Sequence, residues 1–556
     1  MVRATFSGFN TALSALQANQ KRLDITGQNL SNMNTAGYTR QQLEASSLNY
    51  TNPVSHYSNG NETAVGFGVS MDRVSQIRDP YLDIQYRSQS ADCSYTNRLQ
   101  TALNSLSKVL DETTISGIRQ AFDDVQSTLT SMQDPAKVSD PIYESELRTK
   151  MQSVCNLFNQ ASRQITQAEQ NEFQRLTGEG SSEQGDVQKI NDILRQIGDL
   201  NVQIKRNQVA GHPSLELQDE RNLLLDELSG YIPVETRYYK DDAHSGNNAY
   251  DYDANGAVIG KKDWPDDLEV SMNYIDAQGK SQKLILVNGS DLGTDGLTKN
   301  YGQLSVLKGD RQTAASVSDP TNISIKFEKA PSYKGNGQAA ADVYAELKGI
   351  HFEGGSLQAS LDMLQKKGTG NVINGSAVDD VRGYQYYSGK LDQLADTFAK
   401  SMNASNNGNN HKDQNLLSNS TDDSTNGITA GNIGISKGWT SGTIHISTDG
   451  TNRTDTILDM IAAMKDTKKL NGKTFADYMN NLSTQLASDS SSNQTALKTG
   501  TTVLNSIQDS RDSLSGVSLD EEATNMMAYV SAYNAASRLM TALDEVLNTL
   551  ISNTGA

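Results

Sequence analysis

Residues 517–556 predict one long helix whose apolar face needs a partner. Apolar side chains recur there at steps of three and four residues, with one three-residue slip at Tyr533. Ser518 and Glu521 have the spacing of a capping box, and Gly516 is expected to take the left-handed conformation that ends the preceding helix. The stripe comprises Leu519, Ala523, Met526, Val530, Tyr533, Ala536, Met540, Leu543, Leu547 and Leu550. Because an isolated helix of this kind is marginal in water, it requires a second helix to pack against.

The other end of the chain offers such a partner. The same spacing near the N-terminus, broken only by Gln20 and Gly27, gives a stripe of Phe6, Phe9, Leu13, Leu16, Leu23 and Leu30. Basic side chains outnumber acidic ones in residues 1–32, whereas acidic ones predominate in residues 517–556. Since the stripes match in period and oppose in charge, we expect the termini to pair as a coiled coil. The alternative is that two unrelated amphipathic helices dock separately on one globular body.

Three segments resemble one group of bacterial proteins. Residues 29–40, NLSNMNTAGYTR, are similar to the signature shared by the rod, hook and hook-associated proteins of the bacterial flagellum. Residues 515–551 and 215–235 resemble two segments of the hook-associated family that joins hook and filament, and they narrow the resemblance to that family. The residues that carry the family motif are Asn29, Asn32, Asn34, Gly37, Tyr38, Asp520, Glu521 and Glu522.

The resemblance implies a structural role. A member of this family is a self-assembling subunit of the extracellular flagellum, exported by the flagellar type III apparatus without cleavage, and it forms a ring of copies between hook and filament. The implied partners are further copies of the chain, the hook protein, the second hook–filament junction protein and an export chaperone that binds the C-terminal helix. The two terminal stripes would then supply the assembly interface.

Composition excludes several kinds of partner. The net charge is −18 and the isoelectric point is about 4.8, so the chain lacks the basic surface needed to bind nucleic acid or an anionic membrane. No stretch is apolar for long enough to span a bilayer. The N-terminus is amphipathic throughout and has no apolar core typical of a secretory signal, so export is implied only by the family resemblance.

The order of elements predicts domains inserted into one another. All nine prolines lie between Pro53 and Pro331, which permits uninterrupted helices at both ends. Helical spacing is expected over residues 79–111, 118–132, 141–177, 187–204, 214–228, 356–366, 384–398, 456–465 and 474–514. Residues 234–350 instead alternate with period two and contain Asn-Gly and Asp-Gly turns, as in antiparallel hairpins. Residues 403–424 are expected to form a surface loop, with short strands at 433–435 and 443–446.

These patterns predict a mainly α fold with an inserted antiparallel β domain. Residues 1–45 with 517–556 would form the terminal helical coiled-coil domain. Residues 46–232 with 355–516 would form a helical-bundle body, into which residues 233–354 are inserted as a β domain.

Catalytic and metal-binding motifs are not recognisable in the sequence. The six histidines are scattered, and no nucleophile elbow, phosphate-binding loop or zinc spacing occurs, so we expect no cofactor and no enzyme activity. Residues 251–256, DYDANG, match the first half of a calcium loop, but the twelfth position is Lys262, and a hairpin turn is the favoured interpretation. Cys93 and Cys155 are expected to be buried free thiols.

Other functions remain open on the sequence alone. The signature at residues 29–40 argues against flagellin, and the long helical middle argues against hook and rod proteins. A cell-wall hydrolase and a secreted adhesin are the alternatives from other classes. The best-supported function is that of a structural subunit at the hook–filament junction.

Overall fold

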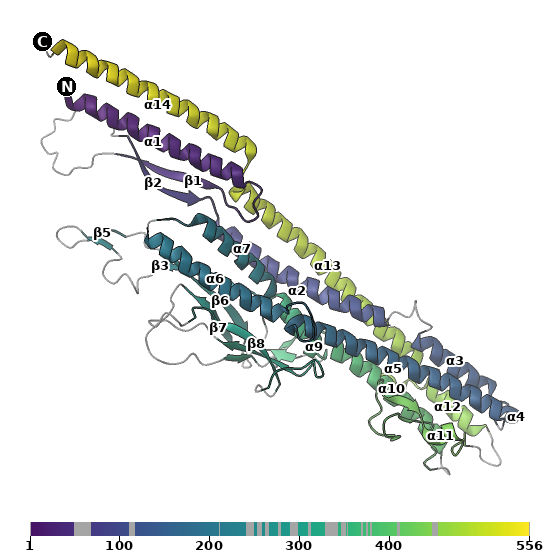
Figure 1. Cartoon of the computed structure of the whole chain (residues 1–556). Helices are drawn as coiled ribbons and strands as arrows, with labels where there is room; N and C mark the ends of the chain where they lie inside the picture. Colours follow the sequence, from purple (N-terminus) through teal and green to yellow (C-terminus); the bar gives the residue numbers. More distant parts are fainter. Residues whose placement is uncertain are drawn as a thin grey trace.

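The computed structural model of the chain describes residues 2–48, 68–110, 117–138, 140–210, 212–240, 250–252, 258–261, 266–275, 280–289, 299–309, 313–328, 343–345, 352, 354–368, 371–373, 376–378, 381–408, 412–447 and 454–554. The molecule is elongated and mostly helical, and both termini lie at the same end (Figure 1).

The helices begin and end where the sequence places capping residues. Asp140 accepts a hydrogen bond from the Ile142 amide at 2.9 Å at the start of α5, and Gly178 closes that helix at φ 77°. Thr474 likewise caps α13 by accepting from the Asp477 amide. The helices are α1 Val2–Asn32, α2 Pro80–Leu110, α3 Ile118–Ser131, α4 Pro135–Val138, α5 Pro141–Thr177, α6 Asp186–Val209, α7 Leu215–Tyr231, α9 Ser356–Gln365, α10 Tyr384–Asn407, α11 Lys437–Ser441, α12 Asp455–Lys465, α13 Phe475–Ser515 and α14 Leu519–Thr554.

The strands form small antiparallel sheets. Two sheets of three strands, in the orders β3-β6-β7 and β10-β9-β8, lie in the region between α7 and α9. Pairs of strands make the remaining sheets: β1 with β2, β4 with β5, β11 with β12, and β13 with β14. The bounds are β1 Gln41–Ser47, β2 Val69–Gln76, β3 Glu235–Lys240, β4 Tyr250–Tyr252, β5 Val258–Lys261, β6 Asp266–Ile275, β7 Ser281–Asn288, β8 Gln303–Lys308, β9 Ile323–Glu328, β10 Val343–Ala345, β11 Asn371–Ile373, β12 Ser376–Val378, β13 Leu417–Asn419 and β14 Ile433–Ile435.

The sheet β3-β6-β7 attaches to helix α6 through its alternating face. Leu268, Val270 and Met272 of β6 are fully buried, as the period-two pattern predicts. The buried side chain of Asn201 on α6 donates to the carbonyls of Leu268 and Gly289 at 3.2 and 3.1 Å. These bonds satisfy backbone groups of β6 and of the residue after β7, and they fix the sheet on the helix.

One hydrophobic core runs through the body. At the end remote from the termini, four phenylalanine rings from α3, α10, α13 and α5 meet with centroid distances of 5.2 to 5.9 Å, and they are Phe122, Phe398, Phe475 and Phe158. Edge-to-face rings of this kind pack densely in a helical bundle. Cys155 is buried in the same core and Cys93 is buried on α2, and both are free thiols, as expected.

Three local expectations were wrong. Gly516 has φ −72° and ψ 155°, not a left-handed conformation; a Cβ there would lie 2.4 Å from the Asp512 carbonyl oxygen, so glycine is required by close approach. The segment expected to be a loop from residue 403 remains helical to Asn407 and contains strand β13. Residues 443–446 form no strand; helix α11 precedes them instead.

The calcium-loop candidate falls only partly within the described residues. Asp251 and Tyr252 belong to β4, which pairs antiparallel with β5 so that Asp251 lies opposite Gly260. Residues 253–257 and the expected turn at 277–279 lie outside the described residues.

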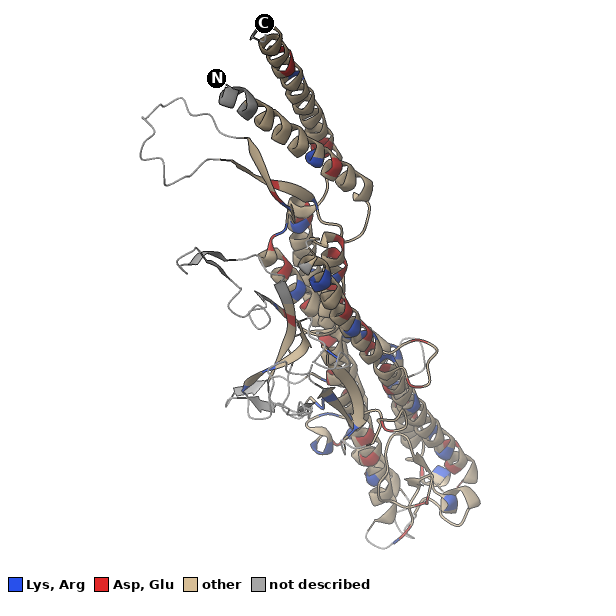
Figure 2. Ribbon diagram, turned by 60° about the vertical axis from the view of Figure 1, so that its left-hand side comes forward, with Lys and Arg blue, Asp and Glu red and all other residues tan. Residues whose placement is uncertain are grey.

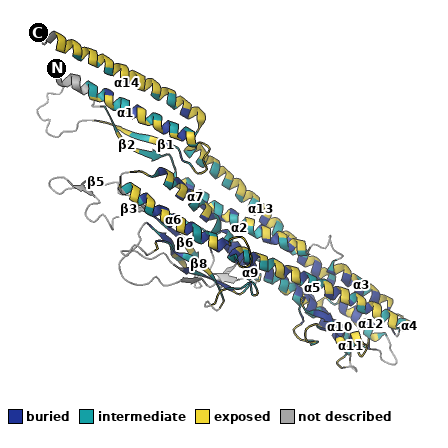
Figure 3. Ribbon diagram, viewed as in Figure 1, coloured by how far each residue is buried: buried dark blue, intermediate teal, exposed yellow. Residues whose placement is uncertain are grey.

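The terminal helices lie side by side, away from the body core. Figure 1 shows α1 between α14 and the β1–β2 hairpin, and Figure 3 shows that most of α14 is exposed. Both signs of charge are interspersed along the body helices (Figure 2). Within the described residues, the terminal pair therefore joins the body at its root, where α1 ends and α14 begins.

Candidate assembly interface

The root of the terminal helices is built around the buried side chain of Asn29. Its Nδ2 donates to the Gln41 carbonyl at 3.0 Å, and its Oδ1 accepts from the Gln41 amide at 3.0 Å. The Tyr38 hydroxyl donates to the same oxygen at 2.9 Å, and burial raises the pKa of Tyr38, so the hydroxyl keeps its proton. Asn29 thus pairs with the first residue of β1 as a neighbouring strand would, and it joins α1 to the hairpin.

The turn that follows α1 uses the remaining motif residues. Asn32 donates from Nδ2 to the Gln28 carbonyl at 3.0 Å and accepts at Oδ1 from the Thr35 hydroxyl at 3.3 Å. Gly37 has φ 77°, and a Cβ there would touch Leu223 of α7 at 3.5 Å. Asn34 is exposed. This turn therefore lies directly against the body helix α7.

Thr39 fastens the turn to the body. Its amide donates to Asp219 Oδ2 at 3.0 Å and its hydroxyl donates to Asp219 Oδ1 at 2.6 Å. Burial raises the pKa of Asp219, although the two bonds from Thr39 and the charge of Arg78 act in the opposite direction. Both carboxylate oxygens of Asp219 thus accept a hydrogen bond from the same residue, Thr39.

Arg40 fastens the same turn to α14. Its Nη1 lies 2.7 Å from Glu521 Oε2 and its Nε lies 2.8 Å from Glu522 Oε1. Glu522 is almost fully buried, whereas Glu521 is exposed. The Arg40 amide also donates to the carbonyl of Ser515, the last residue of α13, at 2.9 Å. Asp520, the third acid of the motif, is exposed in the first turn of α14, where the helix dipole favours negative charge.

Beneath this turn lies a network of alternating charges that links α2, α7 and α13. Arg511 Nη2 lies 3.0 Å from Asp83 Oδ1 and 2.8 Å from Asp226 Oδ2. Arg87 Nε reaches the other oxygen of Asp226 at 2.8 Å, and Arg78 Nε reaches Asp83 at 2.5 Å. Burial alone would raise the pKa of Asp83, but the hydrogen bond and charge of Arg78 hold it below its ordinary value. Asp83 therefore stays ionised and paired.

A cleft of about 750 Å³ lies between parts of the root and the body. It is bounded by the turn after α1, by α7, and by the end of α13 and the start of α14, with Tyr38, Leu223, Arg511, Gly516 and Glu521 among its lining residues. The space on the body side of the α13–α14 link is thus open.

The predicted stripes are only partly covered within one chain. Half-buried residues are Phe9, Leu16, Leu23, Leu30, Met526, Met540, Leu543 and Leu547, whereas Leu13, Leu519, Val530, Tyr533 and Leu550 are exposed. The side chain of Phe6 lies outside the described residues. The role of these side chains in assembly stays a prediction. The exposed ones are accessible to a partner chain.

Three residues of α1 that the stripe prediction omitted are buried, and so is one small residue of the α14 stripe. Ala12 and Ala18 of α1 and Ala536 of α14 are buried, as is Ile25. A Cβ on Gly8 would lie 3.4 Å from Leu543 Cδ1, so α1 and α14 approach closely there. The spacing of small residues along α1 was the sequence signal that could have predicted this close approach. Thr39, Arg40 and Asp219 were likewise missed, although they lie in the segments that carry the resemblance.

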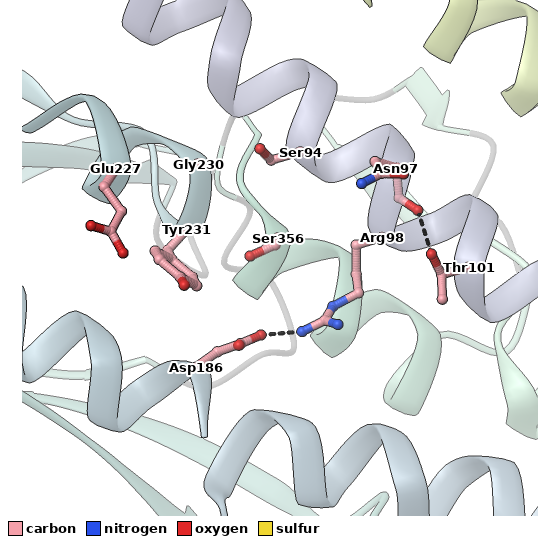
Figure 4. A pocket seen from close by; sticks show the side chains of 9 residues that line it. All are labelled: Ser94, Asn97, Arg98, Thr101, Asp186, Glu227, Gly230, Tyr231 and Ser356. Carbon is pink, nitrogen blue, oxygen red and sulfur yellow. Dashed lines mark hydrogen bonds and ion pairs between the residues drawn. The ribbon is translucent and has the colours of Figure 1, made fainter. Parts of the chain in front are cut away.

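A second cavity, of about 350 Å³, lies between α2, α7, α9 and the start of α6 (Figure 4). Arg98 points into it and pairs with Asp186, and its Nε lies 3.4 Å from Glu172 Oε1. Burial raises the pKa of Asp186 even though Arg98 stands next to it. Two acids already neutralise the guanidinium, so the described residues that line this cavity supply no free cation for an anionic ligand.

The described part of the chain contains neither a metal-binding cluster nor a membrane-spanning helix. None of its His, Cys, Asp and Glu side chains form a group of three that could hold a metal ion. None of the helices described there is both long and apolar enough to cross a bilayer.

Comparisons with known proteins agree with the arrangement at the root. Residues 103–416 match the flagellar hook-associated protein FlgK helical domain. Residues 9–39 match the flagella basal body rod protein family, and residues 510–553 match the C-terminal domain of the flagellar basal body rod FlgEFG proteins. The two ends of the chain that meet at the root therefore match segments of flagellar rod proteins, and its middle matches a hook-associated one.

Individual relatives point the same way. The chain is 29% identical to flagellar hook-associated protein 1 of Bacillus subtilis strain 168, over 99% of both chains. It is 29% identical to the protein of the same name from Salmonella typhimurium over 41% of this chain and 38% of the relative. The solved flagellar hook junction protein FlgK from Burkholderia pseudomallei aligns with a TM-score of 0.37 and 20% identity, over 60% of this chain and 44% of that one. Because the helical-domain match covers more than half of its length, the chain belongs to the flagellar hook-associated protein FlgK family.

Proposed function

We propose that this chain is a structural subunit of the bacterial flagellum and that it forms the junction between hook and filament as a ring of copies. The observation that carries the proposal is the terminal pair: α1 and α14 leave the body together and expose large apolar side chains along α14. The exposed set includes Met527, Val530, Tyr533, Leu539, Val546 and Ile551. Such a face on an otherwise polar chain is typical of a protein–protein interface.

The pairing of the termini is proposed to be a coiled coil that neighbouring subunits complete. Support comes from the opposite net charges of the two helices and from the contact of Arg22 with the ring of Tyr529, at 5.7 Å. The two stripes would then contact further copies with the side chains that one chain leaves uncovered, and the buried small residues would hold the pair together.

The domain division follows the same proposal. Residues 1–45 with 517–556 act as the assembly domain, residues 46–232 with 355–516 as the body, and residues 233–354 as an inserted β domain. In its support, β3 directly follows α7 and the helical pattern resumes at α9. An insertion between these two helices leaves the helical segments before and after it free to pack as one body.

The partners are proposed from the family to which the chain belongs. They are the hook protein on one side, the second hook–filament junction protein on the other, and an export chaperone that binds α14 before assembly. Export through the flagellar type III apparatus would deliver the subunit to the extracellular flagellum.

The test is a strain that lacks this chain. We expect it to build hooks but to release unpolymerised flagellin into the medium, because filament growth would have no junction to start from. Complementation with the wild-type chain should restore filaments, whereas Leu543→Asp should not, since it places a charge on the terminal pair. Leu458→Asp is the control, because it makes the same substitution at an exposed leucine that lies on body helix α12. Normal filaments in the deletion strain would refute the proposed function.

A further inference from the structure

The direction in which α14 leaves the body is decided over three residues. Helix α13 ends at Ser515 and α14 begins at Leu519, so only Gly516, Val517 and Ser518 separate two helices of 41 and 36 residues. A small change of backbone angle in this link moves the far end of α14 by a large distance. The link itself is extended at Gly516. The Gly516 amide still donates to the Asp512 carbonyl and the Ser518 carbonyl accepts from the Glu522 amide, but the helical ladder is interrupted between them, so it does not fix the angle.

We propose that Arg40 is the positioning residue that sets the angle between α13 and α14, and with it the direction of the whole terminal pair. Arg40 lies on neither helix. It contacts the last residue of α13 through its backbone and the first turn of α14 through its side chain, so it bridges the link from one side to the other.

The chemistry of arginine suits this task. The guanidinium is planar and its donors point in fixed directions. The bonds from Nη1 to Glu521 and from Nε to Glu522 therefore hold α14 at two points at once. Glu522 is nearly fully buried, at 3% side-chain exposure, and a buried carboxylate without its partner is unfavourable. Rotation of α14 away from Arg40 would separate this pair.

Arg40 is itself held in place by the body. Thr39, the residue before it, is fixed by two hydrogen bonds to Asp219 of α7, and the Arg40 carbonyl accepts from the Ile77 amide at 2.9 Å, just ahead of α2. The guanidinium is therefore a fixed reference point on the body and not a flexible surface side chain.

The link is not closely packed on its body side. The cleft of about 750 Å³ is lined by residues on both sides of the link, so open space and not close packing adjoins it there. On its other side α14 packs on α1, which ends in the same turn that carries Arg40. Both helices of the pair thus take their orientation from residues 29–40.

The proposal concerns the geometry of the single chain, so it can be tested without a flagellum. Spin labels on Ala528→Cys of α14 and Asn505→Cys of α13, both exposed positions, report the angle as a distance; the native cysteines are buried. From the ~1.5 Å rise per helical residue, the two sites lie roughly 40 Å apart at most. Pulsed electron–electron double resonance can measure such a distance.

We expect one narrow distance distribution for the otherwise wild-type chain and a broad or displaced one for Arg40→Gln. Arg40→Lys, which keeps the charge but lacks the planar fork, should restore the mean distance with a wider spread. Arg73→Gln, which breaks the exposed pair with Glu44 on the hairpin, is the control and should leave the distribution unchanged. A distribution in Arg40→Gln equal to that of the wild type in mean and width would overturn the proposal.

A second variant covers the case in which Arg40→Gln unfolds α14. Glu522→Gln removes the buried charge together with its need for a partner, so α14 should keep its helicity, which circular dichroism measures. The Glu522→Gln variant should still broaden the distance distribution, because one of the two ion pairs from Arg40 to α14 is lost. An unchanged distribution in Glu522→Gln with intact helicity would likewise overturn the proposal.

Discussion

Buried polar side chains, more than apolar ones, define how the parts of this protein meet. Asn29, Asp219 and Glu522 each lie at a boundary between elements, and each is satisfied by named donors or acceptors. A buried polar group is stable only in the arrangement that supplies its partners, so it selects one geometry among many of similar apolar burial. The apolar stripes alone leave the rotation of α1 and α14 open.

Glu169 is a half-buried acid whose charge opposes folding. Burial in α5, together with the nearby charge of Asp392 on α10, raises the pKa of Glu169 to about 7, whereas its ordinary value is 4.5. Asp392 itself accepts from the Ala430 amide at 2.8 Å. The folded chain therefore binds more protons than the unfolded chain between about pH 4.5 and 7, and stability falls as the pH rises through that window.

Glu169→Gln should remove this dependence. At pH 8 we expect the variant to be more stable than the wild type by about 1–3 kcal/mol, and near pH 4.5 the two should be equal within about 0.5 kcal/mol. Urea unfolding at a series of pH values measures the difference. A gap that does not change with pH would show that the substitution acts through packing and not through the proton.

At the residue scale the sequence predicted the motif but not its partners. Asn29, Asn32 and Gly37 were recognised, yet Asp219 is 180 residues away from Thr39 along the chain and no local pattern connects them. Gly516 was assigned a left-handed angle because glycine often ends helices that way; its real constraint is the nearby Asp512 carbonyl, which only the fold reveals.

At the scale of elements, the long helices were predictable because several signals agree. Asp140 with Pro141 predicted the start of α5, and Thr474 predicted that of α13. The Asn-rich segment after residue 403 was mistaken for a loop, because asparagine favours turns. Buried Asn403 and Asn406 instead bind the backbone of the returning chain, at Leu417 and Ser447, which is a tertiary effect.

Two helical glycines allow a matched test of element packing. Gly500 of α13 faces α2, and a Cβ there would meet Cys93 Sγ at 3.1 Å, whereas a Cβ on Gly389 of α10 would meet nothing within 4 Å. Alanine in a helix interior gains about 1 kcal/mol over glycine. We expect Gly389→Ala to raise the free energy of unfolding by about 0.5–1 kcal/mol, and Gly500→Ala to gain nothing or to destabilise.

Thermal and urea unfolding of both variants measure this difference. Equal stabilisation by the two substitutions would mean that α2 and α13 are not held at the close approach described above.

At the scale of the whole molecule, the sequence predicted the order helix, strand, helix but not how the sheets sit. The attachment of the β region depends on single side chains such as Asn191, which exchanges two hydrogen bonds with the backbone of Leu304, and Asn300, which donates to the Gly198 carbonyl. These bonds join residues that are about a hundred positions apart. Period and propensity carry no information about such pairs.

The layout of the core separates the terminal helices from the rest of the chain. Every residue of the continuous hydrophobic core lies between Ala102 and Leu486, whereas α14 contributes only Ala536 to the buried apolar residues described. The root joins the two parts through hydrogen bonds and ion pairs to Asp219 and Ser515 and not through shared core packing. Loss of α1 and α14 therefore removes few buried contacts from the body.

A fragment of residues 78–515 should consequently fold by itself. It keeps the Arg78–Asp83 and Arg511–Asp226 pairs and all of the core, and it lacks the exposed apolar face of α14. We expect one cooperative thermal transition for its helical body, close to that of the full chain, and a monomer in analytical ultracentrifugation at concentrations at which the full chain associates. Since burial of apolar area dominates stability, a fragment that retains the whole core should keep most of its free energy of unfolding. Loss of the transition would show that the terminal helices belong to the core, and an associating fragment would show that assembly depends on the body instead.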